Sequence, residues 1–422
     1  MRVLWTVNLV PANVTAKKNM NSEVLGGWVE SMAKQLSGYE DIQLFVACRS
    51  ENGLEFCEEI DGVTYYSLVY SGSSQVDIEG KCADIIKKVK PDLIHIEGTE
   101  FPHSGAMLRK SKEMGIPAVV SLQGILNGYY DYQYGMLQLD DMIFSTSLTN
   151  IFSGLMMFLR RRLWFSKRLA GEREVIGNAD YLLGRTIWDR AHSYALNNHA
   201  RYYTCNRILR SAFYSENWSI RNCEKHSIYV GNGYNALKGL HFVVKAIPLL
   251  VKEYPDIKVY VAGYKPYQEN DKRSFIKKGY ASYLKKLIKD LDVEKYIEFT
   301  GPLGAPQVAK KLSEVNAYVL CSTIENSPNT LGEAMMVGTP CVSAYVGGVQ
   351  DMVTDGEEAL LYRADDHKFL AWQIKRIFDN EELALSLSEK GKKRAQITHN
   401  PEINAEKLRE AYKDIAADAV KS

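Results

Sequence analysis

The fold of this chain is decided by a stretch that begins with the apolar run Ala317-Tyr318-Val319-Leu320-Cys321. An apolar run of five residues predicts a buried strand. The good helix formers from Leu331 to Met336 follow it, and Gly338 and Pro340 predict the end of that helix. A strand, a polar loop and a helix in this order predict an α/β fold.

Two glutamates lie between this strand and the end of this helix, Glu325 in the loop and Glu333 on the helix. We expect Pro328 in the first helical turn, where its missing N–H costs nothing. The free amides near Asn329 and Thr330 would then point at the occupant of the loop, and an anion or a sugar hydroxyl would fit there. The alternative is a pair of surface glutamates, which is disfavoured because the whole surrounding segment fits a ligand loop.

Short apolar runs alternate with longer amphipathic stretches along the rest of the chain, which is the pattern of parallel sheets covered by helices. The predicted strands are 3–7, 44–47, 93–96, 118–121 and 181–183, and then 228–230, 259–262, 297–300, 317–321 and 341–343. The polar segment from about 210 to 225 separates the two series and predicts a linker. We therefore expect domains over 1–210 and 226–400, with a ligand cleft between them.

Composition agrees with a two-domain protein. A chain of 422 residues is longer than one ordinary core needs. Its formal net charge of +1 gives no overall attraction to nucleic acid, so we expect no nucleic-acid partner. The seven cysteines are scattered and form no Cys-x-x-Cys pair, which predicts a reducing, cytoplasmic location. The apolar N-terminus predicts a first strand, and no signal peptide.

The loop and helix, continued through 338–342 and Gly347-Gly348-Val349, resemble the donor-sugar site of retaining glycosyltransferases of family 4, which have the GT-B fold. Further matching segments come in that family's order and approximate spacing: Val230-Gly231, Leu237-Lys238-Gly239, 259–263 and 299–301. The first half of the chain matches more loosely. The resemblance implies two Rossmann-like domains whose parallel sheets face across a cleft, with a C-terminal helix, 401–422, that crosses back to the N-terminal domain.

The same resemblance implies transfer of a hexosyl unit from a nucleotide sugar, with uridine favoured, to a saccharide or lipid-linked acceptor in polysaccharide or glycolipid biosynthesis. Lys238 would bind the donor diphosphate, Glu333 the ribose hydroxyls and Glu325 the transferred sugar. The loop Ser327-Pro328-Asn329-Thr330 would support the donor. The remaining alternatives from enzymes of this fold, an epimerase and a phosphorylase, are disfavoured by the glutamate pair and its loop.

Two positions depart from the family's pattern. Asn232 stands where an arginine is usual, which lowers the positive charge at the phosphates. Gln123 stands where many relatives carry a histidine that contacts the transferred sugar, and a glutamine hydrogen-bonds but carries no proton at neutral pH. We expect an altered sugar or acceptor recognition with Gln123 in the catalytic set. A catalytically silent protein that binds sugar nucleotides or glycans stays open as the alternative.

Three further features of the sequence suggest ligand contacts. The pair Gly26-Gly27 resembles the glycines through which the N-terminal backbone approaches donor and acceptor, although turns also use glycine pairs. His103, expected on a loop after a strand, and Glu100 are candidates for the acceptor side. The pair Gly347-Gly348 resembles a loop near the donor's phosphates and is also compatible with a tight strand-to-helix turn.

No metal or other cofactor is expected. Asp290-Leu291-Asp292 matches a metal-binding Asp-x-Asp pattern, but its place after a lysine-rich helix favours a solvated helix end. A lysine and a helix N-terminus bear the charge of a leaving diphosphate instead.

The stretch 142–159 has no formal charge and runs into the basic, aromatic segment 160–168. This pattern suits peripheral membrane contact through 142–168 or a lipid-linked acceptor. A helical lid or a dimer interface competes with that interpretation, and the oligomeric state stays open.

Overall fold

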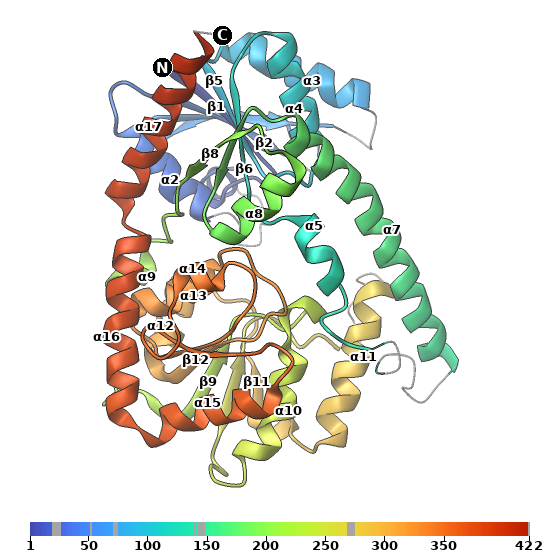
Figure 1. Ribbon diagram of the computed structural model, residues 1–422, viewed down its shortest axis with the longest axis vertical. Helices are drawn as coiled ribbons and strands as arrows, with labels where there is room; N and C mark the ends of the chain where they lie inside the picture. Colours follow the sequence, from blue (N-terminus) through green and yellow to red (C-terminus); the bar gives the residue numbers. More distant parts are fainter. Residues whose placement is uncertain are drawn as a thin grey trace. The chain divides into compact units, whose positions relative to one another are not determined.

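The computed structural model describes residues 1–18, 27–50, 53–70, 75–138, 141, 148–267 and 275–420 (Figure 1). The chain forms two compact units. Unit 1 comprises Met1–Gly128, Lys167–Arg210 and His399–Ser422, and unit 2 comprises Tyr129–Ser166 and Ser211–Thr398. The last helix, α17 (Pro401–Ala419), therefore belongs to unit 1, which confirms the expected return of the C-terminal helix.

Unit 1 is built on a sheet whose eight described strands have the spatial order β3-β4-β2-β1-β5-β6-β7-β8. The strands are β1 (Arg2–Val7), β2 (Gln43–Arg49), β3 (Cys57–Ile60), β4 (Val63–Leu68), β5 (Leu93–Glu97), β6 (Ala118–Ser121), β7 (Tyr181–Gly184) and β8 (Arg201–Thr204). Neighbours are parallel except in the hairpin of β3 and β4. The central strands β1 and β5 are buried almost throughout, which explains their apolar runs.

Two groups of helices bury the two faces of this sheet. α2 (Gly27–Ser37) and α17 contribute to one core, and α3 (Gln75–Val89), α4 (Pro102–Glu113) and the end of α7 (Leu148–Asn178) contribute to the other (Figure 1). Tyr412 of α17 ties the first group to the sheet, because its hydroxyl accepts from Trp5 Nε1 at 2.8 Å and lies 2.5 Å from His95 Nδ1. The remaining helices of this part are α1 (Ala12–Lys17), α5 (Leu126–Tyr129) and α8 (Ile187–Leu196).

Unit 2 contains a parallel sheet with the order β11-β10-β9-β12-β13-β14 among the described residues. Its strands are β9 (Glu224–Val230), β10 (Lys258–Val261), β11 (Ile297–Phe299), β12 (Val315–Leu320), β13 (Cys341–Ala344) and β14 (Leu360–Tyr362). Its helices are α9 (Ala212–Ser215), α10 (Leu240–Leu250), α11 (Phe275–Asp290), α12 (Ala305–Glu314), α13 (Asn329–Val337), α14 (Val349–Met352), α15 (His367–Asp379) and α16 (Glu381–Thr398). α10 packs on α15, and α13 packs on α12 and α16. Every residue of β12 is buried, as its apolar run predicts.

All ten predicted strands are present, and four others escaped prediction. β3, β4 and β8 carry polar and aromatic residues, and β14 has only three residues. β3, β4 and β8 lie at or near a sheet edge and are partly exposed, so they lack the apolar signature of a central strand. β14 is an apolar, buried edge strand, and it was missed because it is short.

The segment predicted as a linker, 210–225, is instead packed into unit 2. Phe213 of α9 is fully buried, and Trp218 donates from Nε1 to Val315 O at 2.8 Å and from its backbone N to Val337 O at 2.9 Å. Two aromatic side chains bury enough apolar area to hold a segment that is otherwise polar.

Residues 129–166 group with unit 2, although the sequence suggested a first domain over 1–210. The backbone N–H of Asn326 donates to the Tyr129 hydroxyl at 2.9 Å. Gly135 lies so close to Ala236 that a Cβ would sit 2.2 Å from the Ala236 carbonyl oxygen. These contacts across the sequence have no local sequence signal.

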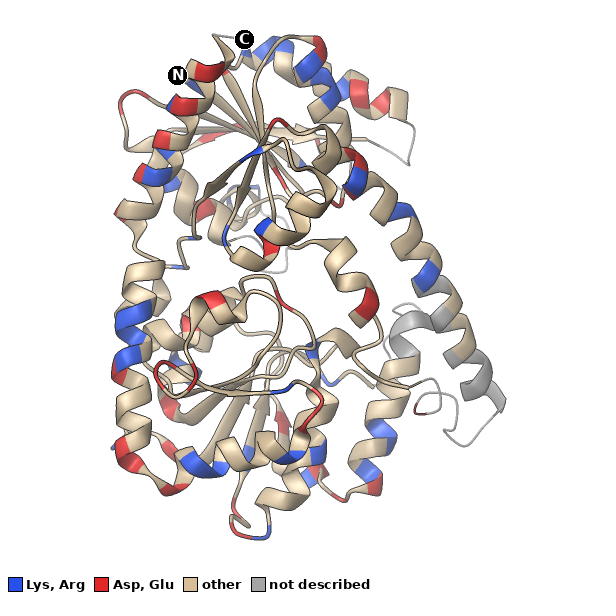
Figure 2. Ribbon diagram, in the orientation of Figure 1, with Lys and Arg blue, Asp and Glu red and all other residues tan. Residues whose placement is uncertain are grey.

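Acidic and basic residues are interspersed on the outer helices of each unit (Figure 2), which agrees with the small net charge. Among the described residues, no helix combines the length and the apolar character that crossing a bilayer requires.

Candidate functional site

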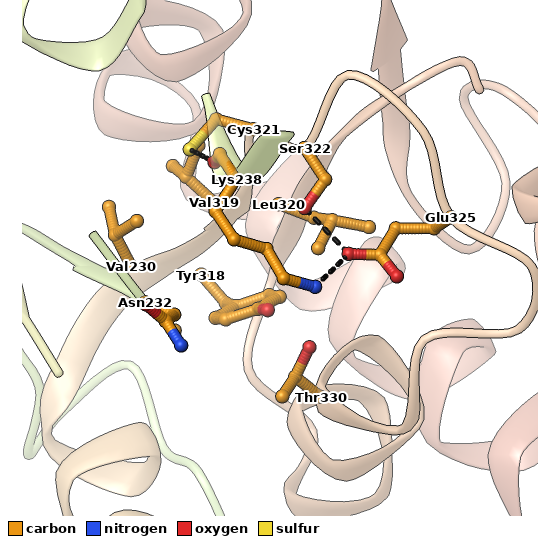
Figure 3. Close-up of a pocket in the computed structure, with 11 residues that line it drawn as sticks. Val230, Asn232, Lys238, Tyr318, Val319, Leu320, Cys321, Ser322, Glu325 and Thr330 are labelled. Carbon is orange, nitrogen blue, oxygen red and sulfur yellow. Dashed lines mark hydrogen bonds and ion pairs between the residues drawn. The ribbon is translucent and has the colours of Figure 1, made fainter. Parts of the chain in front are cut away.

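A pocket of about 110 Å³ lies at the carboxyl ends of β9 and β12 in unit 2 (Figure 3). Gly231 and Asn232 follow β9, while Ser322 and Glu325 follow β12. Lys238 reaches the pocket from the short 3-10 helix η2 (Ala236–Lys238). Ligands of parallel α/β sheets bind at this edge, so the pocket lies where a ligand site is expected.

Lys238 and Glu325 meet in this pocket (Figure 3). Lys238 Nζ lies 2.5 Å from Glu325 Oε1, and Ser322 Oγ donates to the same oxygen at 2.7 Å. The lysine side chain is 37% exposed and the glutamate side chain 11% exposed. The ammonium group is therefore paired within the protein and still open to an incoming ligand.

Gly239 holds Lys238 against the end of β12. Its φ is +68°, and a Cβ there would sit 1.7 Å from the Cys321 carbonyl oxygen. The adjacent turn is fixed by Thr323 N, which donates to Leu237 O at 2.8 Å. Only glycine meets both the backbone conformation and the close approach.

Gly347 and Gly348 pack against the backbone carbonyl of Glu325. Gly347 has a φ of +49°, and a Cβ there would sit 1.9 Å from the Glu325 carbonyl oxygen. Gly348 N donates to the same oxygen at 3.1 Å. The glycine pair thus acts as a tight turn that positions the backbone of Glu325.

The N-terminus of α13 lies next to this pair. Pro328 is the N-cap, one position before the helix begins at Asn329, so the proline precedes the first turn in which it was expected. Thr330 lines the pocket, and the first amides of an α-helix have no acceptor within the helix. Glu333 lies further along α13 and is 4% exposed. Ser327 Oγ contacts Met352 Sδ at 3.7 Å.

Asn232 is exposed at the rim of this pocket. Its Oδ1 accepts from Tyr234 N at 2.9 Å, which leaves its amide NH₂ group beside the pocket (Figure 3). An amide at this position adds a donor without a charge.

Gln123 and Glu100 lie together in unit 1. A Cβ on Gly98 would sit 2.9 Å from Glu100 Oε2 and 3.5 Å from Gln123 Cδ. Arg185 donates to the Gln123 carbonyl oxygen at 2.7 Å, and Thr99 N donates to Glu100 Oε2 at 2.9 Å. Burial raises the pKa of Glu100 despite this hydrogen bond.

His103 lies in the first turn of α4 and is buried, whereas the sequence suggested a loop. Pro102 begins the helix there, a position that suits proline. The His103 ring hydrogen-bonds to the Tyr70 hydroxyl through Nδ1 at 2.9 Å. Burial, with help from the charge of Arg49, lowers the pKa of His103 to about 3, so the ring is neutral near pH 7.

Gly27 is the first residue of α2, and Arg210 packs over it, because a Cβ on Gly27 would sit 2.7 Å from Arg210 Cγ and Cδ. The expected partner glycine, Gly26, lies outside the described residues, as do residues 142–147 of the predicted membrane segment. Asp290 ends α11 and pairs with Lys286. Among the described residues, no group of three histidine, cysteine or acidic side chains is placed to hold a metal ion.

Comparison with known proteins relates the segment that contains this pocket to a protein family. Residues 212–394, which contain the pocket, match the family model described as glycosyl transferases group 1. This match relates residues 212–394, less than half of the chain, to that family.

The chain is similar to two curated proteins, N-acetyl-alpha-D-glucosaminyl L-malate synthase of Bacillus anthracis and D-inositol 3-phosphate glycosyltransferase of Corynebacterium urealyticum. The first is 26% identical over 204 residues, 48% of each chain. The second is 24% identical over 181 residues, 42% of this chain and 41% of the relative. The matches span about half the length of these relatives.

Solved structures share the fold of both units. Sucrose-phosphate synthase from Thermosynechococcus elongatus has a TM-score of 0.75 at 16% identity. The match covers 99% of this chain and 100% of the synthase chain. The structure of Anabaena HepE in complex with UDP and glucose has a TM-score of 0.66 at 15% identity. The match covers 98% of this chain and 100% of the HepE chain. The expected GT-B fold is confirmed.

Tyr318 lines this pocket, and the sequence analysis did not single it out. It lies within β12, is fully buried, and presents its hydroxyl beside Thr330 (Figure 3). Burial raises the pKa of this hydroxyl well above its usual value, so the group stays neutral. The sequence signal that could have identified it is a tyrosine within an apolar strand, because a buried hydroxyl needs a polar neighbour.

Proposed function

We propose that the chain is a retaining hexosyltransferase that takes a hexosyl unit from a nucleotide sugar, with UDP favoured, and passes it to a saccharide or lipid-linked acceptor. The observation that carries this proposal is the pairing of Lys238 with Glu325 in a pocket at the N-terminus of α13. The family match to residues 212–394 and the UDP and glucose bound in the structure of Anabaena HepE support the choice of a nucleotide-sugar donor.

The donor diphosphate would compete with Glu325 for the ammonium group of Lys238. Phosphate oxygens carry more charge than one carboxylate, and the first amides and dipole of α13 add to the attraction. Charge-assisted hydrogen bonds of this kind contribute roughly 1.5–3 kcal/mol each. Release from Lys238 would leave the Glu325 carboxylate available for a hydroxyl of the transferred sugar. Glu333 would bind the ribose hydroxyls.

Transfer with retention would need little more than this arrangement. The leaving diphosphate departs and helps to deprotonate the acceptor on the same face of the sugar, so no protein nucleophile is required. The protein would hold both substrates close and stabilise the departing charge through Lys238 and α13. Gln123 would contact the transferred sugar, and the loop from Ser327 to Thr330 would support the donor.

Thermal-shift titration with UDP-, GDP- and ADP-sugars tests the donor assignment, because a ligand that binds only the folded state raises its stability. We expect a selective shift that Glu333→Ala weakens. Glu389→Ala on the exposed part of α16 is the matched control and should leave the shift unchanged. EDTA should also leave it unchanged, since Lys238 and α13 supply the positive charge. No shift with any nucleotide sugar would contradict the proposal.

A catalytically silent binding protein is the second candidate, and Gln123 and Asn232 favour it because neither carries the charge or the proton that relatives use at these positions. Slow hydrolysis of the donor in the absence of acceptor distinguishes the two. An enzyme should hydrolyse the bound sugar measurably, and a silent protein should bind it with no turnover on any acceptor.

We also propose that α7 contacts an anionic membrane surface, where a lipid-linked acceptor would lie. Leu155, Leu159 and Leu163 follow one another at intervals of four residues and are 46%, 50% and 65% exposed. They therefore form a stripe along one side of the helix, with the exposed Arg162 and Lys167 nearby. An apolar stripe next to cations suits the boundary of an anionic bilayer.

Flotation with vesicles of phosphatidylcholine containing phosphatidylglycerol tests this contact. The wild-type chain should float with these vesicles, and Leu163→Glu should lose most of the binding. Leu385→Glu makes the same change at another exposed leucine, on α16, and should float normally. Equal behaviour of all three proteins would contradict membrane contact through α7.

A further inference from the structure

The Tyr318 hydroxyl is a buried polar group that faces the pocket of unit 2. The residue is 1% exposed, and its hydroxyl oxygen has no hydrogen-bond partner among the residues that the structure describes. Burial raises the pKa of the hydroxyl well above its usual value, and the nearby Thr330 side chain opposes this shift without reaching hydrogen-bond geometry. A buried hydroxyl without a partner costs free energy, so we expect a bound ligand to supply the acceptor.

The sheet fixes the position of this hydroxyl. Tyr318 lies within β12, between Tyr229 of β9 and Cys341 of β13. Its backbone N donates to Pro340 O at 2.9 Å, and its ring centre lies 6.4 Å from that of Tyr229. A side chain packed within a central strand has no room to turn towards another partner, so the hydroxyl stays directed into the pocket (Figure 3).

Gly231 leaves the approach to this hydroxyl open. A Cβ on Gly231 would sit 3.2 Å from the Tyr318 hydroxyl and 3.7 Å from Thr330 Cγ2. A larger residue would therefore cover the hydroxyl with its own side chain, whereas glycine lets a ligand come close. Lys238 lines the same pocket, so the hydroxyl and the ammonium group serve one space (Figure 3).

The pocket is short of positive charge for a diphosphate. Lys238 is the one cationic side chain among the described residues that line it, and this lysine is paired with Glu325. A diphosphate therefore needs further hydrogen-bond donors to hold its oxygens. A neutral hydroxyl that donates to a charged oxygen forms a charge-assisted hydrogen bond, which is stronger than a bond between two neutral groups.

We propose that the Tyr318 hydroxyl donates a hydrogen bond to a phosphate oxygen of the nucleotide that occupies this pocket. The bond satisfies the hydroxyl only when the ligand is present, so Tyr318 is a binding residue and makes no structural hydrogen bond through its side chain. The inference rests on the proposed function, because it takes the diphosphate of a nucleotide sugar as the occupant of the pocket.

Calorimetric titration of Tyr318→Phe with UDP and with UDP-glucose tests this assignment. Phenylalanine keeps the ring and removes the hydroxyl alone. Both ligands should bind roughly tenfold or more weakly, and by the same factor, because a hydrogen bond to a charged oxygen is lost. Inorganic pyrophosphate has no base, ribose or sugar. It should displace UDP from the wild-type protein, and Tyr318→Phe should weaken its binding by a similar factor.

Urea unfolding of the unliganded protein separates this role from a structural one. Because a hydroxyl without a partner costs stability, Tyr318→Phe should leave the urea midpoint unchanged or raise it. Tyr362→Phe is the matched control. The Tyr362 hydroxyl is also buried and without a partner among the described residues, but Tyr362 lies in β14 and does not line the pocket. This control should affect the midpoint in the same way and leave the affinity for UDP unchanged.

The possible failures can be told apart. Equal affinity of UDP for the wild type and Tyr318→Phe would overturn the inference and leave the proposed function intact. A lower urea midpoint for Tyr318→Phe would overturn it too, because the hydroxyl would then have a partner in the unliganded protein. A loss confined to UDP-glucose, or pyrophosphate binding that is absent or unchanged, would overturn the assignment to a phosphate. Wild-type protein that bound neither UDP nor UDP-glucose would contradict the proposed function and this inference together.

Discussion

At the scale of single residues, two glycines set the geometry of the pocket. Gly239 lets the turn that carries Lys238 touch Cys321, and Gly347 lets its own loop touch the backbone of Glu325. Both residues have a positive φ, and both approach a carbonyl oxygen more closely than any Cβ would permit. The Lys238–Glu325 pair therefore depends on backbone contacts as much as on the two side chains.

Replacing Gly239 by alanine should disrupt this arrangement. The left-handed backbone alone costs about 1–2 kcal/mol, and the Cys321 carbonyl must move as well. Gly356→Ala is the matched control, because Gly356 has a φ of +77° with open space around it. Chemical denaturation should show a clearly larger loss of stability for Gly239→Ala, together with a loss of nucleotide binding. Equal losses in the two variants would mean that close packing at Gly239 is unimportant.

Replacing Lys238 by glutamine should weaken nucleotide binding and leave the fold almost unchanged. The ion pair with Glu325 is partly exposed, and pairs of this kind contribute only about 0–1 kcal/mol to stability. A lost contact with a diphosphate should cost roughly 1.5–3 kcal/mol of binding. Calorimetry with UDP measures the second quantity and thermal unfolding the first. Lys252→Gln, at an exposed position of the same unit, should affect neither.

At the scale of elements, prediction succeeded where the signal is local in the sequence. Central strands such as β1 and β12 are buried on both faces and read as continuous apolar runs. The loop between Glu325 and Glu333 was recognisable because its residues follow one another. The sequence did not reveal that Tyr318 lines the pocket or that Gly347 packs against the backbone of Glu325, because each feature depends on a partner distant in sequence.

The segment around α9 illustrates the same limit and gives a prediction. Phe213 is fully buried, so Phe213→Ala should cost about 3–5 kcal/mol of the stability of unit 2. Phe369→Ala makes the same change on α15, where the side chain is 44% exposed, and should stay within about 0.5 kcal/mol of the wild type. Urea unfolding of both variants measures the difference. A small effect at Phe213 would restore the interpretation of this segment as a linker.

At the scale of the whole molecule, the two units differ in their buried histidines. Unit 1 contains His95, His103 and His399, whose pKa values burial lowers to about 4, 3 and 4. Unit 2 contains His241, whose pKa burial lowers to about 3. All four rings are neutral near pH 7 in the folded protein. An unfolded chain would bind protons at these positions from about pH 6.5 downward.

This difference predicts that acid destabilises unit 1 before unit 2. Stability is full above pH 6.5 and falls as the pH decreases towards 4, because the unfolded state then binds protons that the folded state excludes. Each histidine contributes a slope of about 1.4 kcal/mol per pH unit, so unit 1 should lose stability more steeply. Hydrogen exchange of β1 and β9 at pH 7, 6 and 5, corrected for the intrinsic rates, measures this. Protection of β1 should fall first, and neither strand should change between pH 7 and 8. Earlier loss in β9 would show that the buried histidines do not govern the acid response.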